Sequence, residues 1–403
     1  MASFRGIPPR EHGRFPLRRD AFDADRLPPA RQDIFRTVER RIAEPFGGIT
    51  ADGTIRPDLH ILADAPRIDV GPAVATAQIY LEMLSDGQRG PGHLPMDSAA
   101  WRWWTNAFPT WTPHGLLLDD LDEAQRATAL GLIACCLSES GYRQVRSTMR
   151  FNELLGQLIE DYPQTLREFM YRFTVFGRPS AEGAWGWQLA GHHLDVHCAL
   201  IDGRAVLTPV FMGAEPTVID SGPHAGARLF AGEADAGREL MASFSAAERG
   251  SALLFPSMET ALLPPHLNHP TEGRMRSAAG ADNLVLPYEG LAAADMSAAS
   301  QRRLTDVIAL YTAIQPATTA AARLREAERH FADTHFSWVG GWGPGDPFYY
   351  RIHSPVILIE LDHHRGVFLA NEEPTPFHVH TVVRMPNGND YGREFLRQHR
   401  LTT

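Results

Sequence analysis

The sequence predicts an α+β fold, in which a helical N-terminal half packs with antiparallel β-sheet segments in one composite body. Between residues 71 and 176 the apolar residues recur at the spacing of amphipathic helices. From Trp185 the hydrophobicity alternates with a period of two, and Asp202-Gly203 separates two apolar runs as the turn of a β-hairpin does. The alternation returns after Phe336, which predicts a C-terminal meander of strands.

The elements follow in order along two regions. Residues 1–70 are rich in proline and arginine and are expected to form an arm, and residues 71–403 are expected to form a single domain. This domain should be mainly helical over 71–176, a hairpin with loops over 177–290, helical over 291–335, and a β meander with a terminal helix over 336–403. The expected helices lie at Ile34–Ile42, Ala77–Leu84, Ala127–Leu137, Met149–Ile159, Glu233–Leu240, Ser300–Leu310, Thr319–His330 and Gly392–His399. The expected C-terminal strands are Phe348–Ile352, Val356–Asp362, Val367–Ala370 and Phe377–Arg384, after a glycine-rich loop that starts at Trp338.

Composition excludes several classes of protein. The 403 residues are 44% hydrophobic and 21% charged, as in ordinary globular proteins, and the net charge of −10 argues against a nucleic-acid partner. All 38 basic residues are arginine. Without lysine, neither a pyridoxal-phosphate Schiff base nor a P-loop nucleotide site can form.

The cysteines and the chain start bear on location. The three cysteines, Cys135, Cys136 and Cys198, have no metal-binding or disulfide spacing, which favours reduced thiols. The first residues lack an apolar signal segment, and no apolar run is long enough to cross a membrane. We therefore expect a cytoplasmic protein that acts on a small-molecule substrate without a membrane partner. Its oligomeric state is left open.

Histidines gather in the first β segment. Strict alternation would place His193, Asp195 and His197 on one face, together with Trp185, Trp187 and Leu189, and His192 on the other. Side chains two residues apart on a strand are separated by about 6.6 Å, so two imidazoles can approach one ion. His193 and His197 are twice as far apart and could share an ion only if the strand is bulged or strongly twisted. His192 and His193 are the candidate metal ligands of this segment. The alternative is that they are polar residues hydrogen-bonded to neighbouring loops.

A second pair, His378 and His380, has the H-x-H spacing that delivers two imidazoles from one strand. Glu360 and Asp362 share a face at the end of the preceding strand. If the two strands are neighbours, two imidazoles and one carboxylate would form the ligand set of a non-haem iron site or of a catalytic zinc site. Arginine pairing is the alternative role of the two carboxylates. A cupin motif would carry a glutamate after the histidines, where this chain has Val382, Val383 and Arg384.

Nucleophilic and dinucleotide-dependent chemistry have weaker support. The chain has no G-x-S-x-G elbow and no G-x-G-x-x-G after a strand, and Cys198 falls on an apolar strand face. Arg384 is a candidate to bind an anionic substrate group through its guanidinium. Trp187 is a candidate wall of the substrate pocket.

Several longer phrases resemble the domain-of-unknown-function 3500 family (DUF3500), over roughly Ala77 to the C-terminus. They are Phe176-Gly-Arg-Pro-Ser, Trp185-Gly-Trp-Gln-Leu-Ala-Gly-His-His-Leu, Thr208-Pro-Val-Phe-Met-Gly-Ala-Glu-Pro, Tyr349-Tyr-Arg-Ile and Asp390-Tyr-Gly-Arg. The resemblance implies no established reaction. It places Trp187, His192, His193, His380, Asp390 and His399 in the family's recognisable segments, and Tyr391 beside them.

Together these observations predict a metal-dependent enzyme, and we expect an oxidoreductase with one mononuclear iron or copper ion. The expected metal ligands are His192, His193, His378 and His380. Glu360, Asp362 and Asp390 are the expected catalytic residues, and Trp187, Arg384 and Tyr391 the expected substrate-binding residues. A zinc-dependent hydrolase or lyase is the alternative, with Glu360 or Asp362 as base. A non-catalytic small-molecule binding protein is the second alternative.

Overall fold

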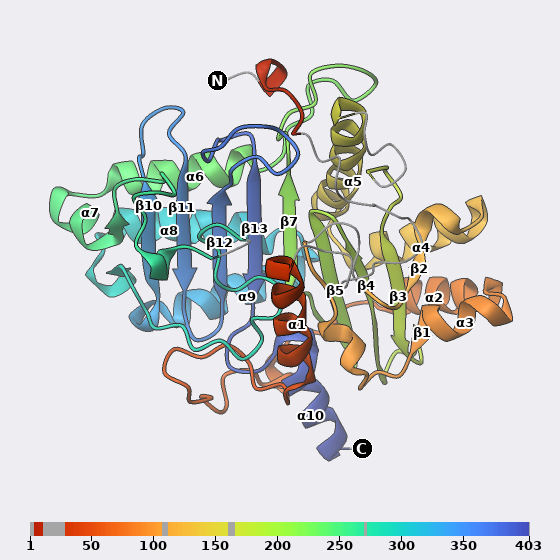
Figure 1. The fold of residues 1–403 in the computed structure, drawn as a ribbon. Coiled ribbons are helices and arrows are strands. Elements are labelled where there is room, and N and C mark those ends of the chain that lie inside the picture. Colours follow the sequence, from red (N-terminus) through yellow and green to blue (C-terminus); the bar gives the residue numbers. More distant parts are fainter. Residues whose placement is uncertain (1–3, 11–28, 107–111, 160–165, 270–271, 403) are drawn as a thin grey trace.

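The computed structural model of the protein describes residues 4–10, 29–106, 112–159, 166–269 and 272–402. In this part of the chain a single mixed sheet of 13 strands runs through the molecule, with helices on its faces, so the predicted α+β class is confirmed (Figure 1). The strand order is β1-β3-β4-β5-β7-β13-β12-β11-β10-β8. Three short strands lie off this path, β2 on β3, β6 on β5 and β9 on β10.

The strands are mostly short. Those of the N-terminal half are β1 (His93–Leu94), β2 (Leu116–Leu117), β3 (Arg172–Gly177), β4 (Ala184–Gly191), β5 (Leu194–Ile201), β6 (Arg204–Val206) and β7 (Val210–Ala214). Those of the C-terminal half are β8 (Leu253–Phe255), β9 (Leu291–Ala292), β10 (His335–Gly340), β11 (Phe348–His353), β12 (Leu358–His363) and β13 (Val379–Arg384). Because β7 pairs with both β5 and β13, it joins the two halves of the sheet.

The helices are α1 (Pro29–Ala43), α2 (Gly71–Met83), α3 (Asp86–Gly92), α4 (Glu123–Cys136), α5 (Glu139–Ile159), α6 (Ala231–Ser243), α7 (Ala246–Ala252), α8 (Ala298–Thr312), α9 (Ala317–Arg329) and α10 (Arg393–Thr402). Local sequence explains where several begin. Asp122 and Ser245 each form a capping box with the residue three positions on, which satisfies two backbone N–H groups that the helix leaves free.

The two faces of the sheet are covered differently. One face is the main apolar core, where Leu194, Met212 and Leu361 pack with residues of α2, α4, α5, α6 and α8. The other face carries a second cluster around Trp104, Phe211 and Val382. In Figure 1, α6, α8 and α9 lie behind strands β10 to β13, whereas α1 and α10 lie in front of the sheet.

The C-terminal meander is confirmed by consecutive antiparallel pairing of β10, β11, β12 and β13. Two details of the prediction are wrong. Residues 367–370 form no strand, because the N–H groups of Val367, Phe368 and Leu369 donate to the buried Glu215 carboxylate instead of to a sheet neighbour. The glycine-rich loop also starts later than predicted, because β10 continues to Gly340.

Two tight turns shape the first β segment. Asp202 and Gly203 have φ angles of 48° and 70° between β5 and β6, which confirms the predicted type I′ turn. A second turn at His192-His193 separates β4 from β5. Because the chain reverses there, Trp187 lies opposite Cys198 and Gln188 lies opposite His197, so the prediction that Trp187 shares a face with His197 is wrong.

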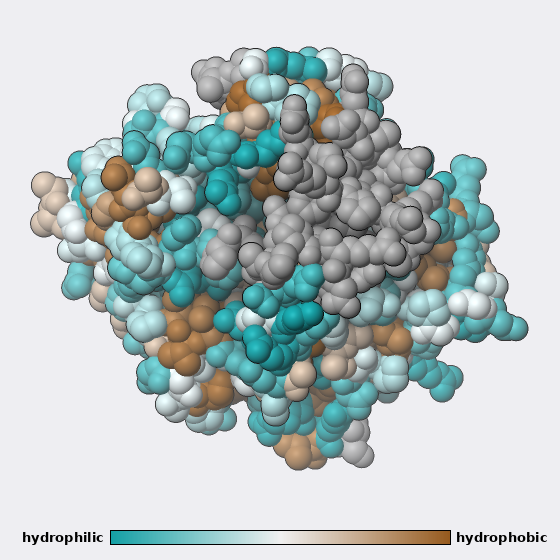
Figure 2. All heavy atoms as spheres, in the orientation of Figure 1, coloured by the Kyte–Doolittle hydropathy of each residue, from teal (hydrophilic) through white to brown (hydrophobic). Residues whose placement is uncertain are grey.

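The visible surface is mostly hydrophilic, with small separate apolar areas (Figure 2). The large apolar side chains that are exposed include Ile79, Leu262 and Val285, which belong to different elements. Among the described residues, no helix combines the length and the apolar character that crossing a bilayer requires.

Candidate metal centre

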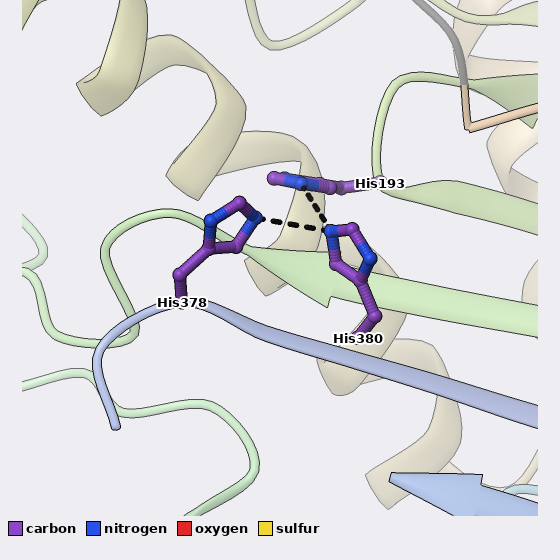
Figure 3. Close-up of side chains that lie close together, drawn as sticks. All are labelled: His193, His378 and His380. Carbon is purple, nitrogen blue, oxygen red and sulfur yellow. Dashed lines mark hydrogen bonds between the residues drawn. The ribbon is translucent and has the colours of Figure 1, made fainter. Parts of the chain in front are cut away.

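Three buried imidazoles meet where β5, β7 and β13 lie side by side. His193 occupies the β4–β5 turn, His378 directly precedes β13, and His380 is on β13. The Nε2 atom of His380 lies 3.0 Å from Nε2 of His378 and 3.2 Å from Nε2 of His193. Figure 3 shows the three rings turned toward one another. One ligand atom from each residue lies within 4.8 Å of the other two.

The backbone places these rings by short-range pairing across β7. Gly213 of β7 lies opposite His380, and its N–H donates to the carbonyl oxygen of His193 at 2.8 Å. A Cβ atom on Gly213 would lie 2.9 Å from Cδ2 of both His193 and His380. The missing side chain of Gly213 therefore provides the space in which the two imidazoles meet.

The spacing of the nitrogens suits a shared ion. With metal–nitrogen bonds of about 2.1 Å, separations of 3.0 and 3.2 Å correspond to angles of about 90° and 100° at one ion. Three imidazoles would occupy three positions on one ion and would leave at least one coordination position for another ligand. Open positions are a property of catalytic metal sites, whereas structural zinc sites are closed by four protein ligands.

The hydrogen bonds of His378 fix its tautomer. Its Nδ1 donates to the carbonyl oxygen of Arg365 at 2.7 Å, so Nε2 carries the lone pair that points at the other rings. Nδ1 of His380 lies 3.9 Å from Oε2 of Glu272. Backbone carbonyls and carboxylates in these positions orient metal-binding imidazoles in other proteins.

Burial keeps the imidazoles neutral. It lowers the pKa of His378 to about 3, and it holds the pKa values of His193 and His380 well below their usual range, with further lowering from neighbouring imidazoles. A neutral imidazole is the form that binds a metal. The three rings are thus in the protonation state that coordination requires.

Two more imidazoles support the three. His192 stacks on His193 with ring centroids 3.9 Å apart, and its Nδ1 donates to Oδ1 of Asn152 at 2.8 Å. His364 stacks on His380 at 4.7 Å and donates from Nδ1 to the carbonyl oxygen of Arg365. His192, a predicted ligand, is therefore outside the group of three. His364 is also outside this group and is buried against it.

Two carboxyl groups that sequence patterns did not indicate lie beside the centre, Glu215, which is buried, and Glu272, which is largely shielded. Oε1 of Glu215 is 3.8 Å from Nδ1 of His378. Burial raises the pKa of Glu215 to about 7, although hydrogen bonds from backbone N–H groups act to lower it. Burial likewise raises the pKa of Glu272 to about 7, with a further contribution from Asp362 and an opposing hydrogen bond from Asn106. Both carboxyl groups can change protonation near neutral pH.

The predicted catalytic carboxylates are engaged by other groups. Glu360 accepts hydrogen bonds from the Tyr349 hydroxyl at 2.6 Å and from the backbone N–H of Ser277 at 2.8 Å. Asp362 forms a buried ion pair with Arg274 at 3.0 Å. The structure does not bring either carboxylate into the histidine group, and the arginine pairing considered for this strand end applies to Asp362.

The predicted substrate-binding residues also have partners within the fold. Arg384 lies between two aspartates, 2.5 Å from Asp282 and 2.7 Å from Asp390, and is completely buried. The hydroxyl of Tyr391 donates to Asp282 at 3.0 Å. Trp187 is completely buried in the core on the opposite face of the sheet. The ion pair between Arg384 and Asp390 links β13 to the segment around residue 390.

Comparison with known proteins identifies the family. The model of the protein family of unknown function DUF3500 matches residues 67–393, which is most of the chain. Neither the curated proteins nor the solved structures contain a match to the sequence. The chain therefore belongs to the DUF3500 family.

Proposed function

We propose that this protein is a metal-dependent enzyme whose centre binds one divalent transition-metal ion through His193, His378 and His380. The observation that carries the proposal is the convergence of three buried Nε2 atoms. Nε2 of His380 lies 3.0 Å from that of His378 and 3.2 Å from that of His193. Both contacts are within hydrogen-bond distance, but a neutral His380 has at most one hydrogen on Nε2 to share between the two facing nitrogens. A cation between the rings would accept a lone pair from all three Nε2 atoms.

The ligand set favours zinc or copper. An iron centre of the mixed type would include a carboxylate, and in the described part of the chain the group of ligand atoms contains only imidazoles. Zinc and copper both bind three imidazoles with positions left open. We place zinc first, because the neighbouring carboxyl group supports water activation.

Glu272 is the proposed general base. Its Oε2 atom lies 3.9 Å from Nδ1 of His380, its side chain is largely shielded from solvent, and burial raises its pKa to about 7, which is the range in which a base accepts a proton most usefully at neutral pH. A zinc ion held by the three histidines would supply a water of lowered pKa, and Glu272 would accept the proton from that water. A hydrolase or lyase acting on a small molecule is the function that this arrangement supports best.

An oxygen-dependent copper oxidoreductase is the second proposal, because an all-histidine ligand set also suits copper. A cavity of about 40 Å³ reaches His364, next to the centre, and is also lined by Gly273 and Arg274. Its size admits one or two water molecules or one diatomic gas molecule. It therefore fits water, the reagent of a hydrolase, and also molecular oxygen, the reagent of an oxidoreductase.

Metal binding is tested by His380→Ala, with His224→Ala as the control, because His224 is exposed on a loop away from the centre. Both variants are loaded with zinc or copper and assayed for bound metal and thermal stability. We expect His380→Ala to lose the metal and to keep its circular dichroism spectrum, and His224→Ala to match the parent. Equal metal content in all three proteins would refute the centre.

The reaction is tested on the metal-loaded protein. With zinc bound, hydrolysis of 4-nitrophenyl acetate should depend on pH with a midpoint near the pKa of the base, and Glu272→Gln should lower the rate while the metal stays bound. With copper bound, oxygen uptake with a phenol or an amine tests the second proposal. Absence of both activities in a fully loaded protein would leave a metal site without the proposed catalysis and would contradict the enzyme assignment.

A further inference from the structure

A second cavity lies at the other end of β13 from the histidines. It has a volume of about 340 Å³ and lies between the segment around His60, the residues that connect β6 to β7, helix α9 and the start of α10. Met385 lines it, and Met385 is five residues beyond His380 along an extended strand, a separation of about 17 Å. The cavity is thus separate from the proposed metal centre.

The floor of this cavity is apolar. Val206, Leu207, Met385 and Phe395 line it, and all four are buried side chains. A volume near 340 Å³ is in the range of cavities that bind small organic molecules. An apolar floor of this size favours a ligand with a hydrocarbon or aromatic part.

The cavity also has a cationic wall. Arg325 and Arg329 of α9 line it, and they are four residues apart, so their side chains lie on the same side of the helix. Both are exposed, and within the described part of the chain neither forms an ion pair. Arg323 on the same helix differs, because it is paired with Glu326 and donates to the carbonyl oxygen of Val356 at 2.7 Å.

Polar atoms among the lining residues remain unsatisfied. The hydroxyls of Thr208 and Thr319 have no hydrogen-bond partner among the described residues, and each residue is only 4% exposed. A buried hydroxyl without a partner costs free energy, which a bound ligand or water recovers. The lining therefore includes two hydroxyl groups that have no hydrogen-bond partner within the described part of the chain.

We propose that this cavity binds a small amphipathic organic anion, whose carboxylate or phosphate is held by Arg325 and Arg329 and whose apolar part rests on Met385 and Phe395. Guanidinium groups bind both kinds of head group through paired hydrogen bonds. The lining also includes the exposed Asp58 and Asp64, and Glu326, which is paired with Arg323 and interacts electrostatically with Arg329. These carboxylates would favour a cation, so the charge of the head group is the point to test. This inference does not depend on the proposed metal centre.

The experiment is isothermal titration calorimetry of the full chain with probes that share one tail: 4-phenylbutyrate, 4-phenylbutanol and 4-phenylbutylamine. Inorganic phosphate and phenyl phosphate test the second head group. We expect 4-phenylbutyrate or phenyl phosphate to bind at one saturable site and the alcohol and amine to bind at least about tenfold more weakly, because charge-assisted hydrogen bonds to arginine are lost. Tighter binding of the amine, or equal binding of the alcohol, would overturn the proposal.

Variants locate the binding. The double variant Arg325→Ala/Arg329→Ala should lower the affinity for the anion by about tenfold or more. The control variant Arg302→Ala/Arg303→Ala removes two exposed charges from α8 outside the cavity and should leave the affinity unchanged. Ala322→Leu fills the cavity without changing its charge and should also reduce binding. Unchanged binding in the first and third variants would place the anion elsewhere. No saturable binding of any probe would mean that the cavity holds solvent only, which also overturns the proposal.

Discussion

Replacing Gly213 with alanine should disrupt the metal centre without touching a ligand. The new Cβ would lie 2.9 Å from Cδ2 of both His193 and His380 and 3.0 Å from the carbonyl oxygen of Val379. Carbon atoms pack at about 3.5–4.0 Å, so each ring must move by about 0.5 Å or more. Metal sites tolerate changes in bond length of only about 0.2 Å. We therefore expect metal affinity to fall by about 10–100-fold, as when a residue that orients a ligand is lost.

The same crowding should lower stability by about 1–3 kcal/mol, the usual cost of an oversized side chain in a packed interior. The assay is competition for zinc against a chelator, with urea unfolding of the apo protein in parallel. Gly131→Ala is the matched control, because its Cβ would meet its nearest neighbour, Thr76, at an ordinary 3.8 Å. A Gly213→Ala protein that binds zinc as tightly as the parent would refute the geometry described for the centre.

The remaining predictions concern buried charges and pH. Arg274→Ala should cost about 3–5 kcal/mol in urea unfolding, because it leaves Asp362 buried without its ion-pair partner; a cost below 1 kcal/mol would contradict the pairing. Arg384→Met should lower stability without changing metal content, since Arg384 pairs with buried aspartates away from the histidines. Unchanged stability would contradict the structural role of these ion pairs. Burial lowers the pKa of His364 and His378 to about 3, so at acidic pH the unfolded chain binds protons that the folded chain does not. Between about pH 7 and 4.5 the raised pKa values of Glu215 and Glu272 act in the opposite direction, so the free energy of unfolding should fall most clearly from about pH 4.5 toward pH 3. A stability that is flat from about pH 4.5 to 3 would contradict the burial of neutral imidazoles.

Local patterns predicted much of the fold. Helical periodicity located most helices, and alternation and turn chemistry located the Asp202-Gly203 turn and the strands β11, β12 and β13. The prediction failed where a side-chain carboxylate, and not a neighbouring strand, accepts the hydrogen bonds of the backbone. Residues 367–370 have a strand-like composition, but the N–H groups of residues 367–369 donate to Glu215, which is more than 150 residues earlier in the chain. No local pattern reports a partner at that separation.

The candidate site was predicted only in part, because local patterns do not show partners that are distant in the sequence. His378 and His380 share one strand, so their spacing was readable, and His193 was one of two adjacent histidines. Glu272 and His364 lie in irregular segments, where the spacing of residues in the sequence does not predict the direction in which their side chains point. Glu360 and Asp362 had the spacing of paired catalytic carboxylates, but Arg274, Ser277 and Tyr349 engage them. Only the three-dimensional structure shows which polar groups already have partners.

The most direct test of the central claim is the metal content of the untagged protein, measured by plasma mass spectrometry after reconstitution with zinc, copper or iron and removal of unbound ions. The proposed centre predicts close to one zinc or copper ion per chain in the parent and almost none in His378→Ala, in which one of the three converging imidazoles is missing. A parent protein that retains none of the three metals, or a His378→Ala variant that retains as much metal as the parent, would contradict the claim.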